Sequence, residues 1–143
     1  CDLRVAAPDA KMGITFVGLG LPPGMGSTHW LPSTVGPQRA NELILTGEVI
    51  DGVEAEKRGL VLRAVDDPVA DAMTMAAKIA KQAPLAVRAS VRAMRLAQDQ
   101  FGGGLEAALR READSQAAVY GSDDLREGVE ALKERRKPTF KGE

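Results

Sequence analysis

The strand-like segments of this chain are few and short, and this limits its fold more than any other feature. Apolar runs that suit short buried strands occur at residues 3–7, 11–16 and 60–65. From residue 67 onward the pattern is helical. A sheet is stable only with about three strands or with a covering helix. We therefore expect an α/β protein whose strands pair with a further segment that precedes Cys1.

Proline, glycine and capping residues mark the expected helix boundaries. Pro37 suits a first helical turn and Gly47 suits a helix end. Asp51 and Glu54 have the spacing of a capping box, and Ser122 can cap the last helix. One expected helix begins at Ser27 or Thr28, and another begins at residue 84. The other expected helices span residues 37–47, 51–59, 67–82, 105–120 and 122–138.

The helix expected to begin at residue 84 has an apolar stripe with a basic stripe beside it. The apolar positions are Val87, Val91 and Met94, and the basic positions are Arg88, Arg92 and Arg95. The arginines suit either phosphate binding or a solvated helix face. A second apolar stripe, formed by Leu125, Val129 and Leu132, follows the last expected helix.

The balance of charges argues against a nucleic acid or an anionic membrane as partner. The chain has 19 Lys and Arg residues against 20 Asp and Glu residues. No apolar run approaches the roughly 20 residues of a membrane span. Cys1 is the one cysteine, which excludes an intrachain disulfide and fits a reducing compartment. We therefore expect a cytoplasmic protein.

A loop dense in glycine and proline, residues 18–26, is the first candidate site. It lacks the third glycine of a dinucleotide-binding fingerprint, and the chain has no Walker motif. Cys1 and His29 are too few for a zinc site. The loop leads into a helix, whose first N–H groups could hold an anion or a polarised oxygen. A tight structural turn explains the glycines equally well.

The C-terminal segment from Lys133 to Lys141 combines clustered positive charges with one aromatic residue, Phe140. This combination suits a ligand that carries both phosphate and adenine. A solubilising terminus accounts for the same residues, so the two interpretations stay open on these grounds.

Three stretches of the chain together resemble the crotonase family of enoyl-CoA hydratases and isomerases. They are CDLRVAAPDAKMG with GLGLPPGMGST, LILTGEVID with AEKRGLV, and DLREG with KERRKPTFKG. The resemblance implies the α/β ClpP/crotonase fold, a spiral of ββα units. Residues 1–66 would supply the last part of the spiral core. Residues 67–143 would supply the helical C-terminal region, through which family members form trimers or dimers of trimers.

The resemblance also implies a protein that binds acyl-CoA and stabilises a thioester enolate in an oxyanion hole of two backbone N–H groups. Both donors, and the first of the two glutamates that hydratases use, would lie in the preceding half of the protein. The position of the second glutamate corresponds to Phe16, which transfers no proton. Thr15 and His29 are the nearby polar residues that could replace it.

The substrate-binding residues follow from the same resemblance. The Gly24 N–H would lie near the substrate, and the acyl pocket would be lined by Phe16, Val17, Pro23, Gly24, Met25 and Trp30. Phe140 and Lys141 would touch the adenine and phosphate of the CoA on a neighbouring subunit. The CoA thioester is the substrate, and no other cofactor and no metal are expected. In a eukaryote the mitochondrial matrix would be the compartment.

Phe16 leaves more than one function open. The first hypothesis is an enzyme of the enoyl-CoA hydratase/isomerase type, which acts through a thioester enolate. The alternative is a non-catalytic or divergent acyl-CoA-binding homologue, such as a hydrolase or a lyase. A third hypothesis is an assembly domain that uses the helical region for packing and binds no CoA.

Overall fold

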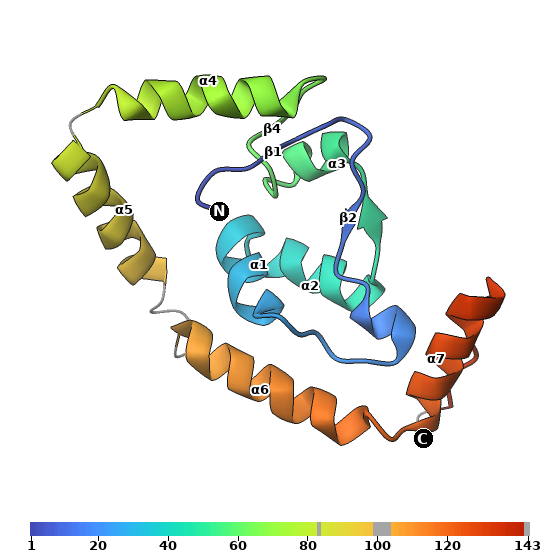
Figure 1. Ribbon diagram of the computed structural model, residues 1–143. Coiled ribbons are helices and arrows are strands. Elements are labelled where there is room, and N and C mark those ends of the chain that lie inside the picture. Colours follow the sequence, from blue (N-terminus) through green and yellow to red (C-terminus); the bar gives the residue numbers. More distant parts are fainter. Residues whose placement is uncertain (83, 99–103, 142–143) are drawn as a thin grey trace. The chain divides into compact units, whose positions relative to one another are not determined.

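A computed structural model describes residues 1–82, 84–98 and 104–141 of the chain (Figure 1). The strands are Val5–Ala6 (β1), Met12–Gly13 (β2), Val49–Ile50 (β3) and Arg63–Ala64 (β4). The helices are the 3₁₀ helix Phe16–Leu19 (η1) and the α-helices Ser27–Val35 (α1), Pro37–Thr46 (α2), Gly52–Lys57 (α3), Pro68–Ala80 (α4), Pro84–Gln98 (α5), Gly104–Val119 (α6) and Asp123–Glu134 (α7).

Local capping chemistry accounts for several helix boundaries, as the sequence predicts. The Asp51 side chain accepts a hydrogen bond from the Glu54 N–H at 2.8 Å at the start of α3. Ser122 accepts one from the Leu125 N–H at 3.1 Å at the start of α7. Gly47 ends α2 in the left-handed conformation, with φ +62°. The structure thus confirms these predicted boundaries. They could be predicted because each depends on residues close together in the sequence.

Several of the expected boundaries are wrong. The expected strands at residues 3–7, 11–16 and 60–65 are limited to Val5–Ala6, Met12–Gly13 and Arg63–Ala64, and the chain turns into η1 at Phe16. The last helix ends at Glu134 and does not reach Pro138, since Arg135 adopts a left-handed φ of 56°. The expected break at residues 102–104 lies largely outside the described residues.

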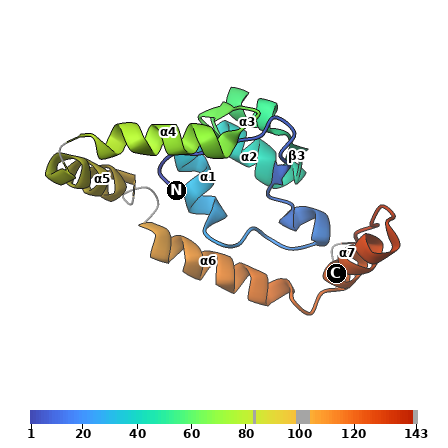
Figure 2. The same ribbon diagram turned by 45° about the horizontal axis from the view of Figure 1, so that its top comes forward.

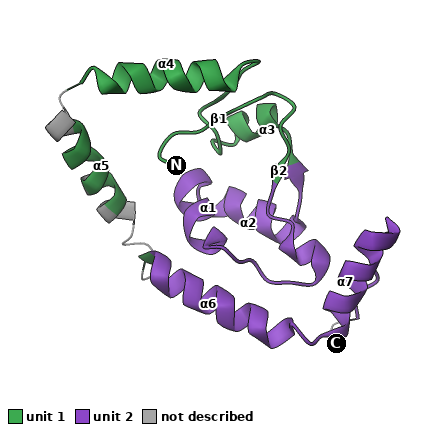
Figure 3. Cartoon of the chain, in the orientation of Figure 1, with its two compact units in different colours: residues 1–12, 50–104 green, residues 13–49, 105–143 purple. Residues whose placement is uncertain are grey.

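The described chain divides into two compact units, and each is assembled from segments far apart in the sequence (Figure 3). Unit 1 contains Cys1–Met12 and Ile50–Gly104, and unit 2 contains Gly13–Val49 and Leu105–Glu143. The units therefore do not follow the expected division at residue 66, because contacts between distant segments define them. That division concerns the core and the helical region of the family fold, and it stays a prediction.

Unit 1 is built on a short parallel pairing of β1 with β4. Val5 lies opposite Arg63 and Ala6 opposite Ala64. Helix α3 packs against β4, and α4 lies alongside β1 (Figure 1). The buried apolar residues of this unit are Ala6, Ile50, Ala55 and Val61.

Unit 2 has α1 and α2 packed side by side, as the two views agree (Figure 2). The helix η1 contacts both α2 and α7. The buried apolar residues of this unit are Leu31, Ala40, Leu43, Ile44, Ala108 and Ala131. Small side chains form much of this core, which allows the helices to approach one another closely.

Helix α7 lies directly on η1 because a glycine stands where the two meet. A Cβ atom on Gly128 would lie 2.5 Å from the carbonyl oxygen of Leu19, well inside van der Waals contact. The buried residues of α7 are Gly128 and Ala131. The buried face of this helix is therefore set by its smallest residues.

The apolar stripe of α7 is not the buried face of this helix. Val129 is 36% exposed and Leu132 is 66% exposed. Large apolar residues usually mark the buried face of a helix. Close approach of two backbones reverses this preference, because only glycine or alanine leaves enough room.

Candidate functional site

All the substrate-binding residues predicted from the sequence lie in unit 2. They are Phe16 and Val17 on η1, Pro23, Gly24 and Met25 in the loop before α1, Trp30 on α1, and Phe140 and Lys141 after α7. Unit 2 thus joins segments that are separated by more than half of the chain. The loop at residues 22–26, called here the Gly24 loop, is the part whose contacts are most fully defined.

The Gly24 loop contains two consecutive left-handed residues. Met25 has φ +61° and Gly26 has φ +74°. Glycine adopts this conformation freely, but for an ordinary residue it costs about 1–2 kcal/mol. The Met25 side chain gains little from burial in return, because the residue is 88% exposed. Contacts elsewhere must therefore hold this backbone in place.

Glu112 of α6 supplies the most direct of these contacts. Its carboxylate accepts hydrogen bonds from the Gly26 N–H at 2.5 Å, the Thr28 N–H at 2.8 Å and the Thr28 hydroxyl at 2.6 Å. Glu112 is only 5% exposed. A buried carboxylate is costly unless it is hydrogen-bonded, and these three donors compensate it.

The start of α1 is therefore capped from another helix. The prediction that Ser27 or Thr28 caps α1 is wrong, because the N-cap residue is Gly26, which has no side chain. The Ser27 hydroxyl instead donates to the Gly24 carbonyl at 2.7 Å. Glu112 takes the place of a cap and puts a negative charge at the positive end of the α1 dipole.

Gln116, one turn after Glu112 on α6, contacts the other end of the loop. Its side-chain amide donates to the Pro22 carbonyl at 3.2 Å. A Cβ atom on Gly24 would lie 2.3 Å from that same amide nitrogen. The absence of a side chain at Gly24 is thus what lets Gln116 reach the loop.

The Gly24 N–H is directed to no acceptor among the described residues of the chain. The residue itself is buried, and its carbonyl accepts from the Ser27 N–H at 3.1 Å. A buried backbone donor without a protein acceptor is uncommon. It is chemically suited to a polarised oxygen or to an ordered water molecule.

Phe16 and Val17 stand at the start of η1, and both are partly buried. A Cβ atom on Gly47 would lie 3.2 Å from a methyl carbon of Val17, so Val17 lies close to the end of α2. No proton-transferring group is available on either side chain. The role of these residues in an acyl pocket stays a prediction.

The two polar residues considered as replacements for the missing glutamate differ in exposure. Thr15 is exposed and precedes η1 without capping it. His29 is 5% exposed on α1. Its ring meets that of Trp30 edge to face, with centroids 4.8 Å apart. Trp30 is 42% exposed and lies beside the Gly24 loop, with its Cδ1 atom 3.2 Å from where a Gly26 Cβ would be.

The segment that carries Phe140 and Lys141 folds back onto α7. Glu127 of α7 accepts a hydrogen bond from the Thr139 N–H at 2.7 Å, and Asp124 accepts one from the Lys141 N–H at 2.7 Å. Phe140 lies between these two anchors and is 40% exposed. The backbone is thus fixed on both sides of an accessible aromatic ring.

An ion pair reinforces this anchoring. Arg136 binds Glu127 through two nitrogens, at 2.6 and 2.8 Å. The Arg136 guanidinium, together with the Thr139 N–H, lowers the pKa of Glu127 from 4.5 to about 2. The same pairing raises the pKa of Arg136. One member of the basic cluster is therefore used in folding the segment.

The basic stripe of α5 is also partly used within the protein. Arg95 binds the Asp2 carboxylate at 2.7 and 3.0 Å, and this pairing lowers the pKa of Asp2. Arg88 and Arg92 are exposed. The proposal that this face binds phosphate stays a prediction.

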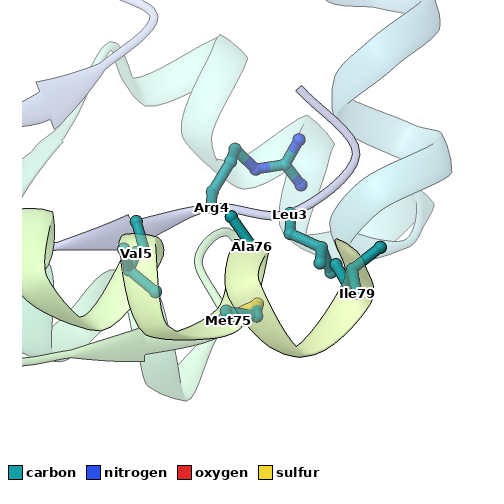
Figure 4. A pocket seen from close by; sticks show the side chains of 7 residues that line it. Leu3, Arg4, Val5, Met75, Ala76 and Ile79 are labelled. Carbon is teal, nitrogen blue, oxygen red and sulfur yellow. The ribbon is translucent and has the colours of Figure 1, made fainter. Parts of the chain in front are cut away.

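Unit 1 contains a groove of about 200 Å³ between β1 and α4 (Figure 4). Leu3, Val5, Ala72, Met75, Ala76 and Ile79 form its apolar lining, with Arg4 beside them. The Arg4 guanidinium donates to the Leu60 carbonyl at 2.8 Å. The lining offers packing surface and no group that could transfer a proton.

In the described ranges 1–82, 84–98 and 104–141, no helix combines the length and the apolar character that a bilayer span requires. No cluster of three or more His, Cys, Asp or Glu residues in that part has an arrangement that could hold a metal ion.

Comparison with known proteins identifies the family. The family described as enoyl-CoA hydratase/isomerase matches residues 1–143. The chain belongs to this family. A relative named probable enoyl-CoA hydratase, from Bacillus subtilis, is 38% identical over 146 residues, which cover 100% of this chain and 55% of the relative.

Solved structures of the enoyl-CoA hydratase/isomerase family confirm the expected crotonase-like α/β fold. An enoyl-CoA hydratase/isomerase from Pseudoalteromonas atlantica matches with a TM-score of 0.84 and 34% identity, over 99% of this chain and 56% of that one. A methylmalonyl-CoA decarboxylase matches with a TM-score of 0.79 and 30% identity, over 99% and 56%. The chain thus spans just over half the length of these relatives.

The sequence predicts the glycine loop but gives no signal for the residues that hold it. Glu112 and Gln116 lie on a helix with several other charged and polar residues, and nothing in their spacing separates them from its exposed face. Their partners are 84 to 94 residues away in the sequence. Only the folded chain brings α6 to the loop.

Proposed function

We propose that this chain is part of an acyl-CoA-binding enzyme of the enoyl-CoA hydratase/isomerase type, in which the Gly24 N–H lies near the thioester. The observation that carries the proposal is a buried Gly24 whose N–H has no acceptor among the described residues. Membership of the enoyl-CoA hydratase/isomerase family supports it, and a relative is named probable enoyl-CoA hydratase. A backbone N–H of this kind suits a polarised oxygen or a water molecule beside the thioester, apart from the two oxyanion-hole donors that the resemblance puts in the preceding half.

The anchored segment after α7 supports a role in binding the CoA part. Phe140 offers an exposed ring for adenine, and Lys141 offers a charge for phosphate. Hydrogen bonds from the backbone N–H groups of Thr139 and Lys141 to α7 fix both positions. We propose that they serve the ligand of a neighbouring subunit in a trimer or a dimer of trimers.

The remaining catalytic groups belong to the rest of the protein in this proposal. The resemblance puts the oxyanion-hole donors and the first glutamate in a half that precedes the matched segment. The relatives are nearly twice as long as the matched region, which supports this assignment. The chain would then be the C-terminal part of the enzyme.

A second candidate function is a divergent or non-catalytic acyl-CoA protein, and Phe16 is the observation that favours it. Phenylalanine can neither activate water nor move a proton, so hydration that uses two carboxylates is not supported. An enolate that forms by loss of CO₂ needs no base to remove a proton, so a reaction of that kind is compatible with Phe16. The decarboxylase among the similar structures is an example of a different reaction on the same fold.

Calorimetric titration of crotonyl-CoA into the protein, followed by analysis of the products, tests these proposals. We expect saturable binding to the wild-type chain and weaker binding to Phe140→Ala, because the ring would no longer contact adenine. Leu132→Ala, which truncates a more exposed apolar residue in α7, is the matched control. Absence of binding would exclude the acyl-CoA function for this chain.

The products separate the two candidates. Formation of 3-hydroxybutyryl-CoA would support the hydratase type despite Phe16, and a shifted double bond would support an isomerase. Release of free CoA thiol would indicate a hydrolase. Binding of an unchanged substrate by the whole protein, which includes the half that carries the remaining catalytic groups, favours the non-catalytic alternative.

A further inference from the structure

We infer that Glu112 is a positioning residue for the substrate, which acts by holding the Gly24 loop, and that Gln116 completes the clamp. The inference rests on the proposed function, because it concerns the same backbone donor. Neither residue would touch the reacting atoms. Their role is to keep the Gly24 N–H at a fixed place and in a fixed direction.

The first argument is the geometry of the loop. Met25 and Gly26 both have left-handed φ values, of 61° and 74°. Such a backbone relaxes unless the surrounding structure opposes the change. The Glu112 carboxylate binds the N–H of Gly26, which is the second of these residues. Rotation of the Gly26 peptide would break that hydrogen bond and leave the buried charge with one donor fewer, beside the N–H and the hydroxyl of Thr28.

The second argument is that α6 grips both ends of the same short segment. Gln116 holds the carbonyl of Pro22 at 3.2 Å, and Glu112 holds the N–H of Gly26. Residues four apart lie on one face of a helix, so both contacts come from a single rigid element. Gly24 lies between the two attachment points.

The third argument is burial. Glu112 is 5% exposed, although it carries a charge and stands in a helix of largely exposed residues. An apolar residue would fill this volume without any cost of desolvation. A carboxylate is needed there because its acceptors match three donors of the loop and of the first turn of α1.

The test compares four variants of the full chain. Glu112→Gln keeps the shape and replaces one acceptor oxygen with a donor, and Glu112→Asp keeps the charge but shortens its reach. Gln116→Ala removes the second contact. Asp114→Asn is the matched control, because it removes a negative charge from an exposed position of the same helix.

The first measurement is amide hydrogen exchange of the loop without ligand. We expect exchange at Gly26 and Thr28 to be at least about tenfold faster in Glu112→Gln than in the wild type, because both amides lose a charged acceptor. Asp114→Asn should leave both rates unchanged. Unchanged protection of these amides in a folded Glu112→Gln variant would overturn the inference.

The second measurement is the affinity for crotonyl-CoA and for free CoA. We expect Glu112→Gln to lower the affinity for crotonyl-CoA about tenfold and to leave that for free CoA unchanged, since the loop would serve the acyl thioester. Glu112→Asp should recover part of the loss. Equal losses for both ligands would mean that Glu112 has only a structural role, which contradicts the inference.

Two outcomes keep this inference distinct from the function on which it rests. If the wild-type chain binds no crotonyl-CoA, the acyl-CoA function fails, and the exchange rates still decide whether Glu112 holds the loop. If Glu112→Gln does not fold, Gln116→Ala decides. It should show the same selective loss for crotonyl-CoA, and a folded Gln116→Ala variant with wild-type affinity would overturn the clamp.

Discussion

At the scale of single residues, the space around Gly24 is filled by the Gln116 side chain. A Cβ atom on Gly24 would lie 2.3 Å from the Gln116 side-chain nitrogen and 3.1 Å from its amide carbon. We predict that Gly24→Ala displaces this amide from the Pro22 carbonyl and destabilises the protein by about 1 kcal/mol, the usual contribution of one hydrogen bond. Gln116→Ala should have a similar effect.

The two substitutions should therefore not be additive. In Gln116→Ala the new methyl group of Gly24→Ala has room. Gly24→Ala should therefore lower the free energy of unfolding by about 1 kcal/mol less in Gln116→Ala than in the wild type. Chemical denaturation of the four proteins in this cycle measures the difference. Gly18→Ala is the control, because a Cβ there meets nothing within 4 Å. Additive costs for Gly24→Ala and Gln116→Ala would refute the contact.

At the scale of elements, the stability of the segment after α7 should depend on pH through Glu127. Its pKa is about 2 in the folded protein and 4.5 as an ordinary carboxyl, because of the Arg136 guanidinium and the Thr139 N–H. A lowered folded-state pKa adds stability that is fully present above pH 4.5 and is lost as the pH falls toward 2. Titration of the Thr139 amide shift follows this loss directly.

Glu127→Gln should remove this dependence, since an amide does not titrate. The difference in unfolding free energy between the wild type and this variant should be constant above about pH 5 and should shrink as the pH falls. Glu130→Gln, which removes an exposed carboxylate from the same helix, controls for the change of net charge. If the free energy of unfolding of Glu127→Gln depended on pH in the same way as that of the wild type, Glu127 would not be the group responsible.

At the scale of the whole molecule, α4 carries apolar residues that the described chain leaves uncovered. The helix has no buried residue, and Val69 and Met73 are 70% and 67% exposed. Exposed apolar surface of this kind favours association. We predict self-association to a mass of three or six times 15.1 kDa, in line with the proposed assembly.

Light scattering after size exclusion measures this mass. Met73→Lys should shift the protein toward the monomer, because a charge would replace the apolar side chain in the contact. Thr74→Lys adds the same charge at the neighbouring exposed position and is the control. A wild-type monomer at every concentration would exclude the assembly.

The sequence by itself determined the features that depend on neighbouring residues. Asp51 and Ser122 begin helices through side chains that bond N–H groups three residues later. Gly47 ends α2 because glycine tolerates a positive φ. The order of the glycine loop and the basic tail also carried the resemblance that the family comparison confirmed.

Only the tertiary structure decided what caps α1, which face of α7 is buried and what holds the Gly24 loop. Each depends on residues distant in sequence: Glu112 with Gly26, Gly128 with Leu19, and Gln116 with Pro22. Periodicity describes one helix at a time, so it marks large apolar residues as the buried ones. Close packing between elements instead selects glycine, and it makes a buried carboxylate favourable where another helix begins.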